Sequence, residues 1–372
     1  MKNTTRLLFS AYVSQIALIN GIEPAHADKH FAVAPAVEQK LEERMKHSSE
    51  FLQLINIIGV DAQEGDKVGI SVTRTMAGRT NTGAGTRRNP TNPADTGDLG
   101  RYRCELTEFD YAWPYSLLDA WAHKPEFEML MTNAVRAQEG RDHIMIGWNG
   151  TSAAAQTDRG ANPLLQDVNK GWLYKIRTFA PERVLDDGAL TVKTDGTNNA
   201  ALKKIYVADG VLFNEAAANA TTAEADYANL DALVYDAVQL LPEYRRTDTD
   251  LVAIIGADLL HEKFLSVVQE AGSTATEMEA RDRILTLPKM VGGKRAIVVP
   301  FFPANAVLVT TLANLSIYLQ NGTRRRMLKE EPALSRVENY ESVNVAYVVE
   351  DYEVAALVEN IVLGKSPARV AP

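Results

Sequence analysis

The chain contains 372 residues, of which 46% are hydrophobic and 23% are charged, which is ordinary for a soluble globular protein that can bury a large core. Its net charge of −9 excludes a bulk basic field that would draw it to nucleic acid or to an anionic membrane. The single cysteine, Cys104, excludes an internal disulfide, and the apolar runs fall short of the roughly 18 residues that a membrane span requires.

The N-terminal residues have two interpretations. Basic residues before the apolar run at 7–19, followed by Ala25-His26-Ala27, give the outline of a secretory signal. Polar residues interrupt that run, however, and Asn20-Gly21 supplies a helix stop, so an amphipathic helix is favoured. The apolar side chains on its face are Leu7, Leu8, Ala11, Tyr12, Ile16 and Ile19. Since no core is adjacent in the sequence, this helix is expected to need a partner protein.

The next part of the chain predicts an arm and a hairpin. Residues 38–54 indicate an arm with a short helix rather than a domain. Residues 67–73 and 102–106 alternate apolar and polar side chains, which predicts two strands. The segment between them is rich in Gly, Pro, Asn and Thr, and so predicts a long hairpin with a large tip. Because a bare hairpin is marginal in water, we expect it to dock on something outside its own domain.

A long helix is expected next, from about residue 126 to about residue 148, with Pro125 at its first turn. At about 1.5 Å per residue it spans over 30 Å and can serve as a spine. From about residue 160, helices at 172–179 and 230–241 alternate with strands at 251–256, 295–299 and 306–310, which predicts a compact α/β or α+β domain. We expect a surface insertion at 186–226, a helix through Phe264 and Val268, and mainly strands after residue 315.

Motifs for catalysis, cofactors and metals are weak in this sequence. Gly292-Gly293-Lys294-Arg295 resembles the end of a phosphate-binding loop, but Arg295 replaces the required Ser or Thr, so a tight turn is favoured. His261-Glu262 lacks the second histidine of a zinc-protease helix, and Cys104 is expected to be a small buried residue. We therefore predict no catalytic, cofactor-binding or metal-ligating residue.

The acidic stretch at 336–359 could be a catalytic cluster or part of a sheet. Its alternation predicts two β segments with a corner near Glu350-Asp351. At about 3.3 Å per residue, Glu353 and Glu359 lie about 20 Å apart, whereas paired glycosidase carboxylates lie about 5 to 9.5 Å apart. The basic clusters Arg87-Arg88 and Arg324-Arg325-Arg326 could meet phosphate, but pairing with carboxylates of a neighbouring chain is favoured in an acidic protein.

Five sequence blocks resemble the major capsid proteins of Peduovirus-type tailed double-stranded DNA phages, in register from about residue 6 to about residue 362. They are LINGIEP at 18–24, FLQLINIIGV at 51–60, NPLLQDVNKGWL at 162–173, NLSIYLQNGTRRR at 314–326 and RVENYESVNVAYVVEDY at 336–352. The order of the expected elements is similar to the Hong Kong phage-type capsid fold as well.

This resemblance implies an α+β phage major capsid fold with an N-terminal arm, an extended β-hairpin loop, a long spine helix, a peripheral domain and an axial α/β domain. The implied divisions are a scaffold-facing segment and arm at 1–60, the extended loop at 61–110, the peripheral domain with its spine helix at 111–159, the axial domain at 160–313, and returning β segments of the peripheral domain with a C-terminal tail at 314–372.

The resemblance also implies a structural protein and not an enzyme. It would assemble in the host cytoplasm into pentamers and hexamers of an icosahedral phage head enclosing double-stranded DNA without binding it specifically. Its other implied partners are an internal scaffold carrying a maturation protease and a portal protein, with no membrane. The protease would remove the N-terminal segment near Lys29, His30 and Phe31. Side chains expected to meet within or between subunits are Arg324, Arg325, Arg326, Glu338, Glu341 and Glu350.

Two other functions remain open from the sequence. One is an encapsulin-type nanocompartment shell, against which the N-terminal arm and the Peduovirus-like blocks argue. The other is a hydrolase with a dispersed site such as Glu108, Asp110 and His123. Some phages of this fold cross-link subunits through a lysine of the extended loop. Because Lys67, the only lysine at 61–110, lies in the proximal strand, we predict no cross-link, and a high-mass ladder from boiled, reduced shells would contradict this.

Overall fold

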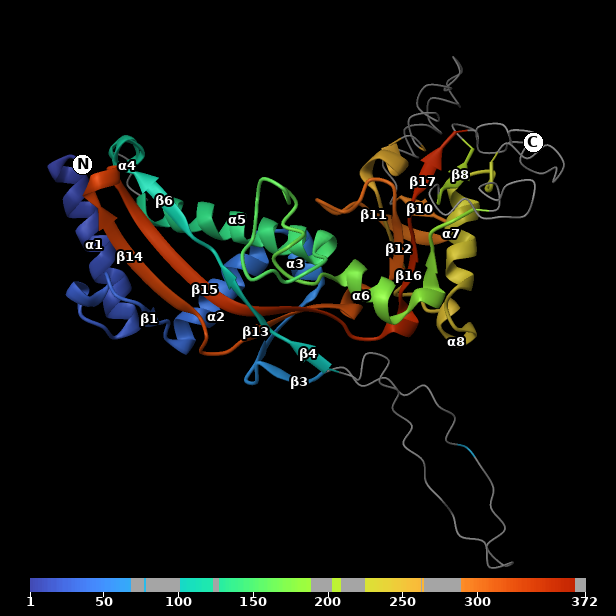
Figure 1. The fold of residues 1–372 in the computed structure, drawn as a ribbon, viewed down its shortest axis with the longest axis horizontal. Coiled ribbons are helices and arrows are strands. Elements are labelled where there is room, and N and C mark those ends of the chain that lie inside the picture. Colours follow the sequence, from blue (N-terminus) through green and yellow to red (C-terminus); the bar gives the residue numbers. More distant parts are fainter. Residues whose placement is uncertain are drawn as a thin grey trace, which may run out of the picture.

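The computed structural model describes residues 1–67, 77, 101–122, 127–188, 203–208, 225–261, 263 and 289–364. The molecule is elongated, with a long sheet running from one end toward its middle and a second sheet at the other end (Figure 1). Its α+β class agrees with the prediction.

The long sheet is organised around one 14-residue strand, β15 (Arg336–Val349). The residue Arg336 pairs with both Glu331 and Pro114, and Val345 pairs with both Leu319 and Glu105, so β15 has partners on both edges. The partners on one edge, end to end, are β13 (Leu315–Gln320) and β14 (Arg325–Glu331); those on the other are β5 (Glu105–Glu108) and β6 (Tyr111–Pro114). Beyond them, β2 (Asn56–Val60) pairs in parallel with β13, and β1 (Phe31–Ala32) pairs antiparallel with β14.

The predicted spine helix is α5 (Phe127–Asn149), although the expected Pro125 start lies outside the described residues. Its C-terminal half packs against α6 (Trp172–Phe179), with the Trp148 and Trp172 rings 4.8 Å apart between centroids. A Cβ on Gly147 would lie 2.3 Å from the Trp172 ring, so glycine permits this close approach. The main core therefore lies between these helices and the face of β15 that carries Val343, Val345, Tyr347 and Val349.

The arm residues contribute to this core. They form two helices, α2 (Pro35–His47) and α3 (Glu50–Leu54), in place of the single short helix expected. Met45, Phe51 and Leu52 are buried in the main cluster, and α2 packs along α5. The arm is thus attached to the subunit's own core over this length.

The second sheet has the strand order β10-β11-β9-β12-β16-β7. Its strands are β10 (Met290–Val291), β11 (Lys294–Ile297), β9 (Val252–Ile255), β12 (Val307–Thr310), β16 (Ala356–Val358) and β7 (Val184–Leu185). The central strand β9 is buried on both faces: Ile254 faces the main core, and Ile255 faces a second core covered by α7 (Leu230–Gln239). A shorter helix, α8 (Glu243–Arg246), follows α7. The predicted strands at 251–256, 295–299 and 306–310 are confirmed as β9, β11 and β12, and the predicted helix at 230–241 is confirmed as α7.

Two expectations in this region have different outcomes. The Gly292-Gly293 turn is confirmed, since both residues have left-handed φ angles, 58° and 77°, between β10 and β11. The prediction of a surface insertion at 186–226 is wrong for residues 205–207. They form the strand β8 (Ile205–Val207), which is buried and pairs in parallel with β17 (Ile361–Leu363). That pairing joins residues over 150 positions apart, which local composition does not reveal. The expected helix through Phe264 and Val268 lies outside the described residues.

The final segment of the chain is shared between the two sheets. Residues 315–349 form strands of the long sheet, whereas β16 pairs with β12 and β7 in the second sheet. Within residues 307–358 the chain therefore crosses between the sheets twice, once before β13 and once after β15, in addition to the earlier passage from β6 to β7.

The expected hairpin is seen at its base. The strand β3 (Glu64–Asp66) pairs antiparallel with β4 (Arg101–Arg103), while the predicted strand residues after Lys67 lie outside the described residues. Tyr102 packs edge-on against Tyr318 of β13, with ring centroids 4.9 Å apart. The base is thus attached to the long sheet.

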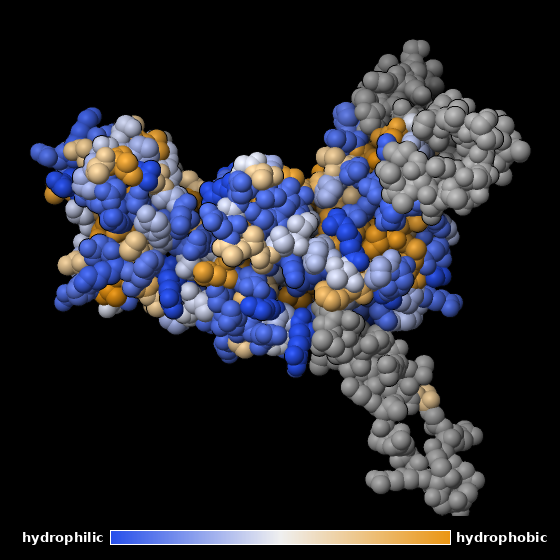
Figure 2. Space-filling model, viewed as in Figure 1, coloured by the Kyte–Doolittle hydropathy of each residue, from blue (hydrophilic) through white to orange (hydrophobic). Residues whose placement is uncertain are grey.

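The N-terminal helix is α1 (Asn3–Asn20), ended by Gly21 with a left-handed φ of 68°. The expectation that it has no adjacent core was wrong, because Tyr12 and Ile16 pack against Leu118 of α4 (Tyr115–Trp121) and Leu328 of β14. Its outer face remains apolar and exposed, with Leu7, Leu18 and Ile19 all at least half exposed. Figure 2 shows such apolar patches among hydrophilic residues at this end of the molecule.

Candidate functional site

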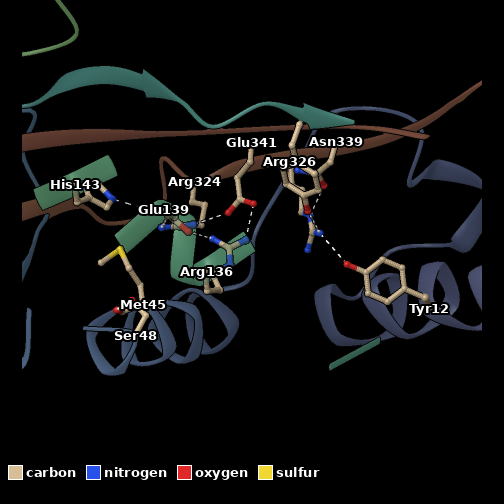
Figure 3. Close-up of polar contacts among 11 residues, drawn as sticks. Tyr12, Met45, Ser48, Arg136, Glu139, His143, Arg324, Arg326, Asn339 and Glu341 are labelled. Atoms are coloured by element: carbon tan, nitrogen blue, oxygen red, sulfur yellow. Dashed lines mark hydrogen bonds and ion pairs between the residues drawn. The ribbon is translucent and has the colours of Figure 1, made fainter. Parts of the chain in front are cut away.

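Four buried charged side chains form a closed ring between α5 and the long sheet (Figure 3). Arg136 donates from Nη2 to Oε2 of Glu341 at 2.6 Å and from Nη1 to Glu139. Arg324 donates from Nη1 to Oε1 of Glu341 at 2.5 Å and from Nη2 to Oε1 of Glu139 at 3.1 Å. Each arginine bridges both glutamates, so the charges of this ionic ring sum to zero.

The regular periods of helix and strand assemble the ring. Arg136, Glu139 and His143 recur at intervals of three and four residues, which places them on one face of α5. Just before and within β14, alternation sends Arg324 and Arg326 to the buried face and Arg325 to the exposed face. The helix therefore presents charges to a sheet face that carries the opposite charges.

Both ring glutamates are held in the ionised form. Each ring residue is at most 3% exposed, and such burial by itself raises the pKa of a carboxyl group. The adjacent Arg136 and Arg324 outweigh burial and hold the pKa of Glu341 and of Glu139 below their ordinary values. Carboxylates bound in this way by two arginines act as a clamp and not as proton donors.

Two titratable groups flank the ring. His143 Nδ1 lies 2.9 Å from the hydroxyl of Tyr347, and burial lowers the pKa of His143 to about 4, so its ring is neutral at pH 7. Glu42, half-buried on α2, has its pKa raised to about 7 by burial, and the nearby Glu38 and Glu139 raise it further against the opposing effect of Arg324. The charge of Glu42 on α2 therefore changes near neutral pH.

A second buried arginine links α1 to the sheet. Arg326 donates from Nε to Asn339 at 2.8 Å, and from Nη2 to the hydroxyls of Tyr12 at 3.1 Å and Tyr111 at 3.3 Å. Figure 3 shows Tyr12 reaching Arg326 from α1. This contact holds the N-terminal helix against β14 and β15.

Of the six side chains expected to meet, the structure brings Arg324 and Glu341 together within the chain. Glu338 instead accepts from Arg336 and Tyr340, and Glu350 accepts from Tyr318. Arg324, Arg326 and Glu341 are buried within the subunit, while Arg325 is exposed. Contacts of Arg325 with a neighbouring subunit stay a prediction.

The processing region lies at the surface. Lys29 and His30 are exposed between the 3₁₀ turn η1 (Pro24–His26) and β1, and Phe31 begins β1 opposite Arg326. A protease could therefore reach the first two residues, and cleavage there stays a prediction.

The carboxylates considered for catalysis are scattered. Glu353 accepts from the hydroxyl of Tyr244, and Glu359 accepts from Nε of Arg177 at 2.7 Å. Asp110 accepts from the amide of Glu341 at 3.2 Å, Glu108 is exposed, and His123 lies outside the described residues. In the described part of the chain, His, Cys, Asp and Glu form no group of three or more that could hold a metal ion.

Sequence reasoning missed Arg136, Glu139 and His143. A signal was present, because these polar residues share a helix face with Ile144 and other apolar side chains. Charged residues on an otherwise apolar face indicate a buried pair with a partner elsewhere in the chain.

Of the helices in the described ranges, none is long and apolar enough to cross a membrane.

Comparison with known proteins gives one consistent result. Residues 8–361 match the family described as phage major capsid protein, P2 family. The chain is 40% identical to the capsid proteins of Escherichia phage P2, covering 99% of this chain and 98% of that protein. It is 39% identical to the major capsid protein of Serratia phage KSP20, covering 97% of each.

A solved structure agrees with these sequences. A chain from the satellite phage P4 procapsid including the size determination (Sid) protein superposes with a TM-score of 0.76 at 38% identity. The match covers 98% of this chain and 99% of that one. Capsid proteins of this kind build the icosahedral head of the virion, which is a structural role. The chain belongs to the P2 family of phage major capsid proteins.

Proposed function

We propose that this subunit assembles into pentamers and hexamers of a phage head that encloses double-stranded DNA without binding it specifically. The family match over residues 8–361 carries the proposal. The net charge of −9 supports it, because an acidic subunit gains little from counterion release and leaves packaged DNA free to move.

The subunit divides along its two sheets in this proposal. Residues 1–60 are the arm, 61–110 the extended loop, 111–159 the peripheral domain with α5 as its spine, and 160–313 the axial domain. Residues 315–349 return to the peripheral domain in the same proposal. Because β16 pairs with β12 and β7 of the second sheet, and β17 pairs with β8 within residues 160–313, we assign residues 356–363 to the axial domain and not to the peripheral one.

A maturation protease carried by an internal scaffold removes the segment that ends near Lys29, His30 and Phe31. Exposure of Lys29 and His30 supports this step. The segment also packs in a small cluster separate from the main core, so its loss leaves that core intact. The head joins a portal protein, assembly takes place in the host cytoplasm, and the subunit itself has no catalytic activity.

Co-expression with the scaffold gene, followed by electron microscopy, tests the proposal. Closed icosahedral shells are expected, and N-terminal sequencing of subunits from matured shells should find the new terminus near Phe31. A protein that stays monomeric under all conditions would contradict the assembly. A mature subunit that retains Met1 would contradict the processing step alone.

A further inference from the structure

The crossing before β13 and the crossing after β15 lie side by side and are joined by hydrogen bonds. The first contains the 3₁₀ turn η7 (Leu312–Asn314), and the second contains η9 (Tyr352–Val354). The Asn314 side chain donates to the carbonyl of Asp351 at 2.8 Å and to Thr310 at 3.1 Å, and it accepts from the Asp351 amide at 2.7 Å. We call these two segments, which the Asn314 side chain of the first joins to Asp351 of the second, the crossover pair.

Lys67 reaches the crossover pair from the base of the hairpin. It follows β3 directly, and its Nζ donates to the carbonyl of Val349, the last residue of β15, at 2.8 Å. The same Nζ lies 4.4 Å from the centroid of the Tyr352 ring, which is a cation–π distance. Tyr352 is buried and packs against Phe179 of α6. The lysine therefore has one contact at the end of the long sheet and one on the segment that leads to the second sheet.

The hairpin base consequently has two attachments on different parts of the subunit. Tyr102 of β4 packs on Tyr318 of β13 within the long sheet, and Lys67 packs on Tyr352 of the crossover pair. If the second sheet turns relative to the long sheet, Tyr352 moves relative to Tyr318. Two fixed points that move apart must reorient the strands between them.

We propose that Lys67 is a positioning residue that couples the direction of the hairpin base, β3 and β4, to the relative placement of the two sheets. The coupling goes beyond the proposed assembly, because it concerns contacts within one subunit. An ordinary surface lysine would be exposed and would contact solvent; Lys67 is half-buried and contacts a carbonyl and an aromatic ring together.

Hydrogen exchange in the full-length unassembled subunit tests the attachment. Lys67→Met should speed exchange of the β3 and β4 amides about tenfold, since charged hydrogen bonds contribute enough to alter an equilibrium by that factor. Lys67→Arg should restore the slow rates, because arginine keeps the charge and the donors. The matched control is Lys40→Met, at an exposed lysine of α2, which should leave the wild-type rates unchanged.

A double-mutant cycle tests the coupling itself. Asn314→Ala loosens the crossover pair without touching Lys67, so it should speed exchange in β3 and β4 of the otherwise wild-type chain. In the Lys67→Met background it should have little further effect on those strands. Should Asn314→Ala fail to fold, Thr310→Val, which removes one hydrogen bond of the Asn314 side chain, replaces it in the same cycle.

Several results would overturn the coupling: wild-type exchange in Lys67→Met, no restoration by Lys67→Arg, additive effects in the cycle, or equal acceleration in every strand. None of them depends on shell formation, so the proposed assembly can fail or succeed separately.

Discussion

Glu341 shows how strongly a single side chain can tie this fold together. It accepts from Arg136 of α5 and from Arg324 just before β14, which are nearly 190 residues apart in the chain. Glu341→Gln would leave the two arginines with Glu139 alone, and unpaired buried charge is costly. The free energy of unfolding should fall by about 3–5 kcal/mol in urea titrations of the subunit. Glu43→Gln, on the exposed face of α2, is the control and should change it by less than about 0.5 kcal/mol; equal effects would contradict the clamp.

Glu42 is expected to make stability depend on pH. Its folded pKa of about 7 lies above its ordinary value, so the folded chain holds a proton that the unfolded chain releases, and stability falls as pH rises from about 4.5 through 7. Glu42→Gln removes this loss. The free energy of unfolding of the variant should therefore rise relative to that of the wild type between pH 5 and pH 8. The expected rise is about 1 kcal/mol, because solvent screens a half-exposed group. Thermal melts at both pH values measure the gain, and His143 titrates equally in both proteins; a difference that is constant with pH would contradict the assignment.

At the scale of the element, α1 is attached by one face and apolar on the other. Ile16→Ala removes a buried contact of a small, separate cluster and should release the helix while the main core stays folded, because such truncations cost about 2–5 kcal/mol. Limited proteolysis should then cut near Lys29 faster than in the wild type. Leu18→Ala, on the face that is 77% exposed, is the matched control and should be cut at the wild-type rate. Equal rates for both variants would show that α1 does not depend on this cluster.

At the scale of the whole molecule, Arg325 is the residue of the Arg324-Arg325-Arg326 cluster that is exposed and accessible to a neighbouring subunit. Arg325→Glu should leave the melting temperature of the subunit unchanged, since the side chain lies at the surface. Closed shells should become rarer in electron micrographs, because reversing one partner of a charge pair between subunits costs about 2 kcal/mol or more at each contact. Lys40→Glu is the charge-matched control. Shells formed at the wild-type yield by Arg325→Glu would remove this residue from the interface.

Several elements were predictable because their signals are local. The helix period identified α5 with its end within about one residue, Asn20-Gly21 marked the end of α1, and Gly292-Gly293 marked a turn. Short apolar runs identified the strands around residues 252 and 307. These signals depend on backbone geometry and side-chain periodicity over a few residues, which a single sequence contains.

The remaining features were decided by tertiary structure. The sequence by itself determined the acidic balance, the main helices and strands, and the resemblance to a phage capsid family. The pairing of β8 with β17, the ionic ring and the binding of Lys67 at the crossover pair each join segments more than 150 residues apart. Which buried charge meets which partner depends on how the two sheets and α5 pack, since an unpaired charge is excluded from a core but the identity of its partner is set only by the assembled fold.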